Sequence, residues 1–323
     1  MNKVNSNANA NGMPFVLDFS LIDVINVNEM LDAYLSEGID LHPKYDKDGN
    51  IHVDVEHNPN HNDGVNTSVL DNPTSFNLNV PKIKTLPTTI NVWSIFQRTK
   101  LSQQTKIASS DGNPLIYAFK NEKNYSFKSA YDKETIQALI DQILDKFVDR
   151  WYASIDDNVA TVVCPSGNAL NDFFAKAFEK ATNGKGKNVQ LYDNVLTKAT
   201  VEDVKYHVFD DPNSELNRWL FSLSDAKAKN AKRKLDKSFS RMENEHKGLF
   251  SYHFIEDSSI RNMISKSMSV NMESHADIDN KHVLLLDDTI SRGKTLQEAY
   301  QLICSSYNPK SVTALTLFSP LKK

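Results

Sequence analysis

Residues 282–296 read HVLLLDDTISRGKTL, and this stretch decides the fold. Four consecutive apolar residues, Val283 to Leu286, predict a strand buried on both faces, as in a parallel sheet covered by helices. Two carboxylates, Asp287 and Asp288, follow directly. Because ligands of open parallel sheets bind outside the carboxyl ends of the strands, the sequence predicts that this acid pair lies at a binding edge.

Regular segments before and after this stretch indicate the same fold class. Short apolar runs alternate with amphipathic segments, which is typical of strands and helices in turn. We expect strands at 159–164, 188–194, 249–255, 283–286 and 311–318, and helices at 132–148, 166–181 and 295–307. Asp132 is the expected N-cap of the first helix. The inward helix faces are expected to carry Ile136, Leu139, Ile140, Ile143, Leu144 and Phe147 in the first helix, and Leu170, Phe173, Phe174, Ala177 and Phe178 in the second. The predicted fold is α/β, with a mainly parallel sheet and helices on both faces.

The chain divides into three parts by composition. Residues 1–13 are rich in asparagine and predict a disordered tail. Residues 14–125 are polar and turn-rich, with strand-like alternation at 51–57, and predict a partly β accessory region. The regular alternation of strands and helices fills 126–323, which we assign to one α/β domain.

Composition narrows the class of protein. The chain has 323 residues, of which 40% are hydrophobic and 24% charged, and its formal net charge is −4. This charge gives no general attraction to nucleic acid or to anionic membranes. The two cysteines, Cys164 and Cys304, are too far apart in sequence to indicate a disulfide framework or a structural zinc site. Because no apolar run suits a membrane span or a signal peptide, we expect a cytoplasmic protein without membrane contact.

The loop after the acid pair has the composition of a phosphate site. Thr289, Ser291 and Thr295 supply hydroxyl donors, and Gly293 allows close approach of the backbone to an anion. A strand-to-helix turn also offers free backbone N–H groups and the positive end of the helix dipole. Carboxylates beside a phosphate suit a ligand that carries hydroxyl groups as well, or a bridging Mg²⁺. The pattern predicts binding of a ribose 5-phosphate.

Two other interpretations of the stretch explain less of it. A P-loop shares the ending Gly-Lys-Thr, but its spacing requires a glycine where Asp288 stands. A strand followed by a capped helix explains one aspartate and one threonine. It does not explain the other residues of the stretch or their order.

LLLDDTISRGKTL, residues 284–296, resembles the phosphoribosyl-pyrophosphate (PRPP) motif of type I phosphoribosyltransferases, and a weaker likeness extends over 155–320. This resemblance implies a phosphoribosyltransferase-like domain at 126–323. It implies PRPP or ribose 5-phosphate as ligand, Mg²⁺ as cofactor, and phosphoribosyl transfer to a nitrogenous acceptor with release of pyrophosphate. The acceptor is not specified by the sequence.

The same resemblance assigns roles to individual residues. Asp287 and Asp288 would act on the ribose hydroxyls and approach Mg²⁺ indirectly, through the ribose or water. The 5′-phosphate would be wrapped by Thr289, Ile290, Ser291, Arg292, Gly293, Lys294 and Thr295. The turn Ser166, Gly167 and Asn168 matches the pyrophosphate loop in position.

Two departures from the family bear on the reaction. Arg292 replaces the usual Thr or Ser, although arginine also binds phosphate. Ser291 stands where 6-oxopurine salvage enzymes carry an Asp that acts as acid/base, and serine replaces this role poorly. The sequence therefore disfavours purine salvage.

A basic segment, 227–247, leaves several functions open. Its cations Lys232, Arg233, Lys234 and Arg241 could serve the pyrophosphate, because the family supplies such cations between the second and third strands. The alternative is a solvated helix with Leu235, Phe239 and Met242 inward. The stretches 115–124, 162–178 and 238–254 also resemble ComF-like proteins, which implies an accessory role in DNA uptake and weak nonspecific nucleic-acid binding. A non-catalytic PRPP-sensing regulator and a homodimer also stay open.

Overall fold

The computed structural model describes residues 39–40, 43–45, 51–53, 56–57, 73–78, 89–97, 114–120, 125–127, 130–153, 155, 158–166, 169–187, 189–211, 214–290 and 293–319. A six-stranded sheet forms the centre, in the order β5-β6-β13-β12-β8-β9. Its strands are β5 (Thr74–Asn77), β6 (Thr89–Gln97), β8 (Val159–Val163), β9 (Gln190–Tyr192), β12 (His282–Thr289) and β13 (Ser311–Ser319). All neighbouring strands are parallel except β5, which is antiparallel to β6.

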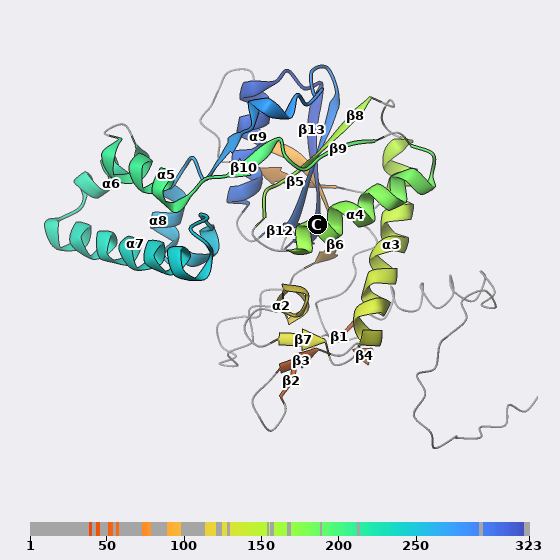
Figure 1. The fold of residues 1–323 in the computed structure, drawn as a ribbon, viewed down its shortest axis with the longest axis horizontal. Helices are drawn as coiled ribbons and strands as arrows, with labels where there is room; N and C mark the ends of the chain where they lie inside the picture. Colours follow the sequence, from red (N-terminus) through yellow and green to blue (C-terminus); the bar gives the residue numbers. More distant parts are fainter. Residues whose placement is uncertain are drawn as a thin grey trace, which may run out of the picture.

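Helices cover both faces of this sheet (Figure 1). Successive residues of β12 belong to two different cores, as the period of a strand requires. Leu284 and Leu286 pack with α3 (Ala130–Tyr152) and α4 (Ala169–Gly184). Val283 and Leu285 pack with α9 (Lys294–Ser306) on the opposite face. The predicted α/β class, with a mainly parallel sheet between two helical layers, is confirmed.

The local predictions for the helices and strands mostly hold. The expected inward residues of α4 are buried, apart from Phe173, which packs against the core from a partly buried position. The expected N-cap of α3 is wrong, because the helix begins at Ala130 and Asp132 is its third residue. Alanine has the highest helix propensity, so the helix extends over Ala130 instead of starting after Asp132. Leu139 lies outside the residues whose burial is described.

The sheet uses residues from before the predicted domain. β5 and β6 come from 14–125, which the sequence analysis assigned to an accessory region, and β6 pairs with the central strand β13. The predicted boundary at residue 126 therefore does not coincide with the edge of the sheet. The predicted tail at 1–13 lies outside the described residues.

Short elements make up the rest of the N-terminal region that the structure describes. These are β1 (Ile39–Asp40), β2 (Pro43–Tyr45), β3 (Ile51–Val53), β4 (Glu56–His57), α2 (Pro114–Lys120) and β7 (Tyr125–Phe127). The predicted alternation at 51–57 forms two strands in different sheets, because β3 pairs with β2 and β7 whereas β4 pairs with β1. Figure 1 shows α2 and β7 beyond the end of the sheet at which β12 and β13 finish.

A helical lobe, residues 201–264, is inserted between β10 (Leu196–Lys198) and β11 (Met268–Val270), which pair with each other. It contains α5 (Val201–Lys205), η3 (Tyr206–Asp210), α6 (Glu215–Ser222), α7 (Asp225–Glu245), η4 (Tyr252–Phe254) and α8 (Ser258–Met263). The lobe has a hydrophobic core of its own, which includes Phe239 and Phe250. After β11 comes a short 3-10 turn, η5 (Met272–Ser274).

The strand predicted at 249–255 is wrong. Leu249 makes a single bridge to Thr200, and residues 252–254 form the 3-10 helix η4. The apolar residues Phe250 and Ile255 are buried in the core of the lobe instead of in a sheet. No helix in the part of the chain that the structure describes is long and apolar enough to cross a membrane.

Candidate functional site

The acid pair lies at the carboxyl end of the central strand β12, as predicted. Pairing of β12 with β8 ends at Leu286 and Val163, and the Cys164 N–H still donates to the Leu286 carbonyl at 2.8 Å. Beyond this point β8 leaves the ladder, and only β13 continues beside β12. Asp287 and Asp288 therefore stand where the sheet opens, yet they are only 6% and 5% exposed.

Asp288 is held by groups from two other parts of the chain. Lys120 Nζ, at the end of α2, lies 3.0 Å from Asp288 Oδ2, and both side chains are largely buried. Ser166 Oγ donates to the same oxygen at 3.4 Å. By the alternation of the strand, Asp288 shares the face of Leu284 and Leu286, which is the face that α4 covers. Of the predicted pyrophosphate turn, Ser166 is thus beside the acid pair, whereas Gly167 and Asn168 lie outside the described residues.

The surroundings of Asp287 raise its pKa. Burial, and then repulsion from Asp288, raises the pKa of the Asp287 carboxyl to about 8. The positive charges of Lys120 and Lys198 act in the opposite direction. The physical cause is general, since desolvation and a like charge both disfavour the ionised carboxylate. A ligand that donates hydrogen bonds to Asp287, or brings a positive charge close to it, would therefore stabilise the ionised form of this carboxyl group at neutral pH.

Lys198, the last residue of β10, is a second cation of the site. Burial lowers the pKa of its ammonium group, while the charges of Asp288 and Asp287 oppose this shift. Neither Lys120 nor Lys198 was predicted as a site residue. Lys198 lies in the interval between the second and third strands from which the family resemblance implied cations, so that interval held a signal. Lys120 comes from α2, and nothing local in the sequence indicates its contact with Asp288.

The neighbouring thiol is not a reactive group. Cys164 is fully buried opposite the acid pair, and burial followed by the charges of Asp287 and Asp288 raises its pKa well above the usual value. Nucleophilic cysteines need a lowered pKa and access to solvent. The Cys164 carbonyl accepts a hydrogen bond from Asn171 Nδ2, which fixes the start of α4 against the end of β8.

The turn after the acid pair leads into the N-terminus of α9. Gly293 is the N-cap and has φ 72°, a left-handed conformation that favours glycine. A Cβ added at Gly293 would lie 2.0 Å from Phe76 Cζ, so the ring of Phe76 on β5 packs directly against the turn. Ser291 and Arg292, both predicted as phosphate ligands, lie outside the described residues.

The remaining residues of the predicted phosphate loop have different environments. Thr289 Oγ1 is buried and has no hydrogen-bond partner among the described residues, so it can serve a ligand. Ile290 is buried, and its N–H donates to the Phe318 carbonyl at 2.8 Å, so this N–H group is not available to a phosphate. Lys294 Nζ donates to the Asn262 carbonyl of α8 at 3.2 Å, so its charge faces the helical lobe. Thr295 is half-buried in the first turn of α9.

Glu298, a buried glutamate that was not among the predicted site residues, ties the lobe to α9. Tyr252 OH donates to Glu298 Oε2 at 3.1 Å, and Ser267 donates to Glu298 through its N–H and its hydroxyl. Burial raises the pKa of Glu298, and these hydrogen bonds act against that shift. Glu298 therefore fixes α9 against the lobe.

The basic segment lies in the helical lobe. It forms α7, with Leu235, Phe239 and Met242 buried, which confirms the prediction of a solvated helix with these residues inward. Lys234 pairs with Asp257, and Arg241 pairs with Glu256, both within the lobe. Figure 1 shows α7 as part of the helical lobe, to one side of the sheet. Among the residues that the structure describes, Lys120 and Lys198 are the cations that act on the acid pair.

The sequence matches no protein-family model and no curated protein. Among solved structures, the fold is similar to the crystal structure of HGPRT-ase from Leishmania tarentolae in complex with GMP. The sequence identity is 10%, the match covers 58% of this chain and 68% of that chain, and the TM-score is 0.28. A similarity of this strength assigns neither a family nor a function.

Proposed function

We propose that the chain binds PRPP or ribose 5-phosphate at the carboxyl end of β12. The observation that carries this proposal is the buried pair Asp287 and Asp288 at the end of β12, followed in the chain by Gly293, the left-handed N-cap of α9. Carboxylates accept hydrogen bonds from hydroxyl groups, whereas a helix N-terminus favours a phosphate. A ribose 5-phosphate carries both groups.

The described residues support separate roles for the two ends of this ligand. Asp287 and Asp288 accept hydrogen bonds from the ribose hydroxyls, because both carboxyl groups stand at the end of β12 where pairing with β8 has stopped. The phosphate lies against the turn before α9, where the hydroxyl of Thr289 lacks a partner within the described structure. An anion there faces the backbone N–H groups of the first turn of α9.

Lys120 and Lys198 suit the pyrophosphate of PRPP. Both charges act on the acid pair, so both ammonium groups are close enough to serve an anion that binds beside these carboxylates. In the transfer reaction the bond from C1 to the pyrophosphate oxygen breaks, and the electron pair leaves with the pyrophosphate. A nitrogen of the acceptor forms the new bond to C1 and loses a proton. Fixed positive charges stabilise the leaving group in such a step.

The protein alone supplies only some of the ligands that a Mg²⁺ ion needs. Within the described part of the chain, no three His, Cys, Asp or Glu side chains come together in a way that could hold a metal ion. Two carboxylates match an ion that takes most of its oxygen ligands from the pyrophosphate and from water. Asp287 and Asp288 would then orient the ion indirectly, and Mg²⁺ would neutralise charge on the leaving group.

A PRPP-binding regulator without transfer activity is the second candidate. It is favoured by the ion pair of Lys120 with Asp288, which already balances one acid of the site, and by Ser291 at the position of the acid/base in purine enzymes. The likeness to ComF-like proteins, with its role in DNA uptake, stays a prediction from the sequence.

Pyrophosphate release separates the two candidates. The protein is incubated with PRPP, Mg²⁺ and a panel of purines, pyrimidines, nicotinamide-type bases and anthranilate. A transferase releases pyrophosphate above background with one acceptor class, and Lys198→Ala loses most of this rate while an exposed control, Lys232→Ala, keeps it. If PRPP binds and no acceptor gives release, the regulator is the correct function. If PRPP does not bind, both candidates fail.

A further inference from the structure

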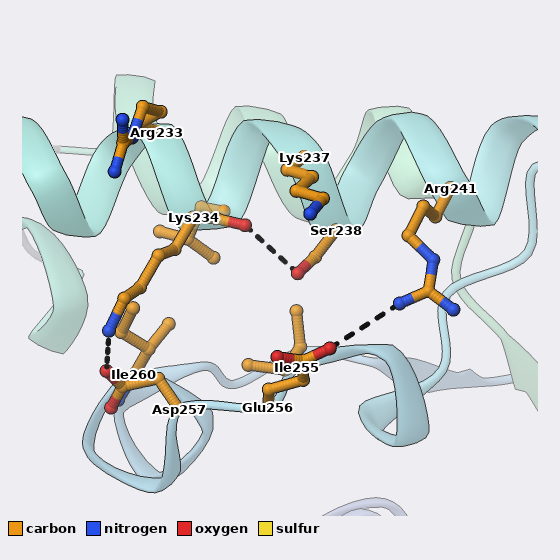
Figure 2. A pocket seen from close by; sticks show the side chains of 10 residues that line it. Arg233, Lys234, Lys237, Ser238, Arg241, Ile255, Glu256, Asp257 and Ile260 are labelled. Atoms are coloured by element: carbon orange, nitrogen blue, oxygen red, sulfur yellow. Dashed lines mark hydrogen bonds and ion pairs between the residues drawn. The ribbon is translucent and has the colours of Figure 1, made fainter.

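A groove lined with cations runs along the helical lobe between α7 and the segment 255–260 (Figure 2). The groove has a volume of about 640 Å³. We call it the basic groove. It is lined by Arg233, Lys234, Leu235, Lys237, Ser238, Arg241, Ile255, Glu256, Asp257 and Ile260.

The helical period places the cations on one face of α7. Arg233, Lys237 and Arg241 follow one another at intervals of four residues, so they lie above one another on the helix surface. At 1.5 Å per residue, the row from Arg233 to Arg241 is about 12 Å long. Lys229 and Lys232 are also exposed but do not line the groove.

The groove has an excess of positive charge. Lys234 Nζ lies 2.9 Å from Asp257 Oδ2, and Arg241 Nη1 lies 3.6 Å from Glu256 Oε1. Figure 2 shows both side chains reaching from α7 across to these acids. The four cations face two carboxylates, so two positive charges are left without compensation inside the groove.

The two surplus cations are Arg233 and Lys237. The Arg233 guanidinium donates to the neutral Asn230 Oδ1 at 3.1 Å. Lys237 has no ion pair with any other residue that the structure describes. Arg233 and Lys237 can therefore each pair with an anionic oxygen of a ligand without first breaking an ion pair with a carboxylate of the groove.

The walls of the groove are rigid enough to preorganise these charges. Leu235, Ile255 and Ile260 are each 1% exposed and belong to the core of the lobe, which fixes α7 against the opposite wall. The Asp257 carboxylate caps α8 by accepting from the Ser259 and Ile260 N–H groups. The cationic stems thus extend from a packed scaffold.

We propose that the basic groove is a second anion site, which binds a small molecule carrying two or more linked phosphates. Its volume lies in the range of small-molecule pockets. Arginine binds phosphate in a bidentate manner and lysine as a point charge. The wall with Glu256 and Asp257 repels an extended polyanion and closes the groove on one side, which favours a short polyphosphate over a nucleic-acid strand. The site is separate from the acid pair of β12.

Calorimetric titration of the full chain with inorganic tripolyphosphate at low salt tests this site. We expect saturable binding with one ligand per chain in the presence of saturating ribose 5-phosphate, and weaker binding as salt is added. Arg233→Ala/Lys237→Ala should weaken binding about tenfold or more, because charge-assisted hydrogen bonds to phosphate are lost. The matched control Lys229→Ala/Lys232→Ala removes the same charge from outside the groove and should change the affinity less than about twofold.

A variant that strengthens binding excludes a purely structural effect. Glu256 is an exposed acid of the groove wall, and Glu256→Gln should tighten tripolyphosphate binding, because a repelling charge is removed and Arg241 keeps only one of its two carboxylate partners, Glu245. The proposal is overturned if wild type shows no saturable binding, or if Arg233→Ala/Lys237→Ala binds like wild type. If a short oligothymidylate binds more tightly than tripolyphosphate, and the same double variant abolishes that binding, the groove binds a nucleic-acid strand and the proposal of a small-molecule site is overturned. If ribose 5-phosphate does not bind, only the proposed function is contradicted. The affinities of the groove variants for tripolyphosphate still show whether that ligand binds in the basic groove.

Discussion

Replacing Gly293 by alanine places a methyl group where the ring of Phe76 stands. The new Cβ would lie 2.0 Å from Phe76 Cζ and 2.6 Å from Cε1, far inside any real contact. The left-handed φ of 72° costs an alanine about 1 kcal/mol. Displacing a packed ring costs about 1–3 kcal/mol more. We therefore expect Gly293→Ala to lower the free energy of unfolding by about 2–4 kcal/mol.

A second glycine of the chain provides the matched control. Gly186 has φ 65°, and nothing lies within 4 Å of a Cβ added there. Gly186→Ala should cost only the backbone term of about 1 kcal/mol. Truncation of the ring in Phe76→Ala should remove most of the additional cost of Gly293→Ala, which gives a coupling energy of about 1–3 kcal/mol in a double-mutant cycle.

Urea denaturation of the four variants and of wild type measures these free energies. The reasoning is refuted if Gly293→Ala costs no more than Gly186→Ala, or if its full cost persists when Phe76 is alanine. Either result would mean that Phe76 does not press on the turn before α9.

Three other predictions concern the charges of the site and the acceptor. The raised pKa of Asp287 means that its protonated form contributes stability below pH about 4, where the unfolded chain also binds the proton, and that this contribution is lost as pH rises toward 8. In urea denaturation, the free energy of unfolding of Asp287→Asn should therefore rise relative to that of wild type by about 1.4 kcal/mol per pH unit between pH 5 and 7, and the difference should level off above pH 9. A difference that does not change with pH would contradict this prediction. Lys120→Met should lower the free energy of unfolding by about 3 kcal/mol, because Asp288 is left buried without its cation. Most of this loss should disappear in Lys120→Met/Asp288→Asn. An equal loss in both variants would show that the ion pair is not the cause. Wild type should turn over hypoxanthine and guanine poorly, and Ser291→Asp should raise any purine activity in the pyrophosphate assay; strong purine turnover by wild type would contradict the role given to Ser291.

Local patterns predicted the elements that contain the acid pair. Apolar runs specified β8, β12 and β13, because buried parallel strands need side chains on both faces to be apolar. The 3.6-residue period specified the buried faces of α3 and α4. The position of Asp287 and Asp288 at a strand end followed from the point at which the apolar run stops.

Contacts between distant segments were not visible in these patterns. Lys120 reaches Asp288 only because α2 packs beyond the end of the sheet, and Phe76 reaches Gly293 only because β5 joins the edge of that sheet. The aromatic run at 249–255 has strand-like composition, yet the core of the lobe buries Phe250 and Ile255 without a partner strand. Tertiary packing thus overrode local propensity there.

The binding of PRPP by wild type and by Asp287→Asn/Asp288→Asn tests the central claim most directly. Titration calorimetry with PRPP and Mg²⁺, with ATP as a comparison ligand, measures both affinities, and urea denaturation shows whether each protein is folded. An exposed acid on α7, replaced in Asp236→Asn, is the matched control for loss of charge. We predict saturable PRPP binding by wild type and by Asp236→Asn, and at least about a hundredfold weaker binding by the folded double variant, equivalent to about 2.7 kcal/mol. Equal PRPP affinity in the double variant, or a wild type that binds ATP and not PRPP, would contradict the account.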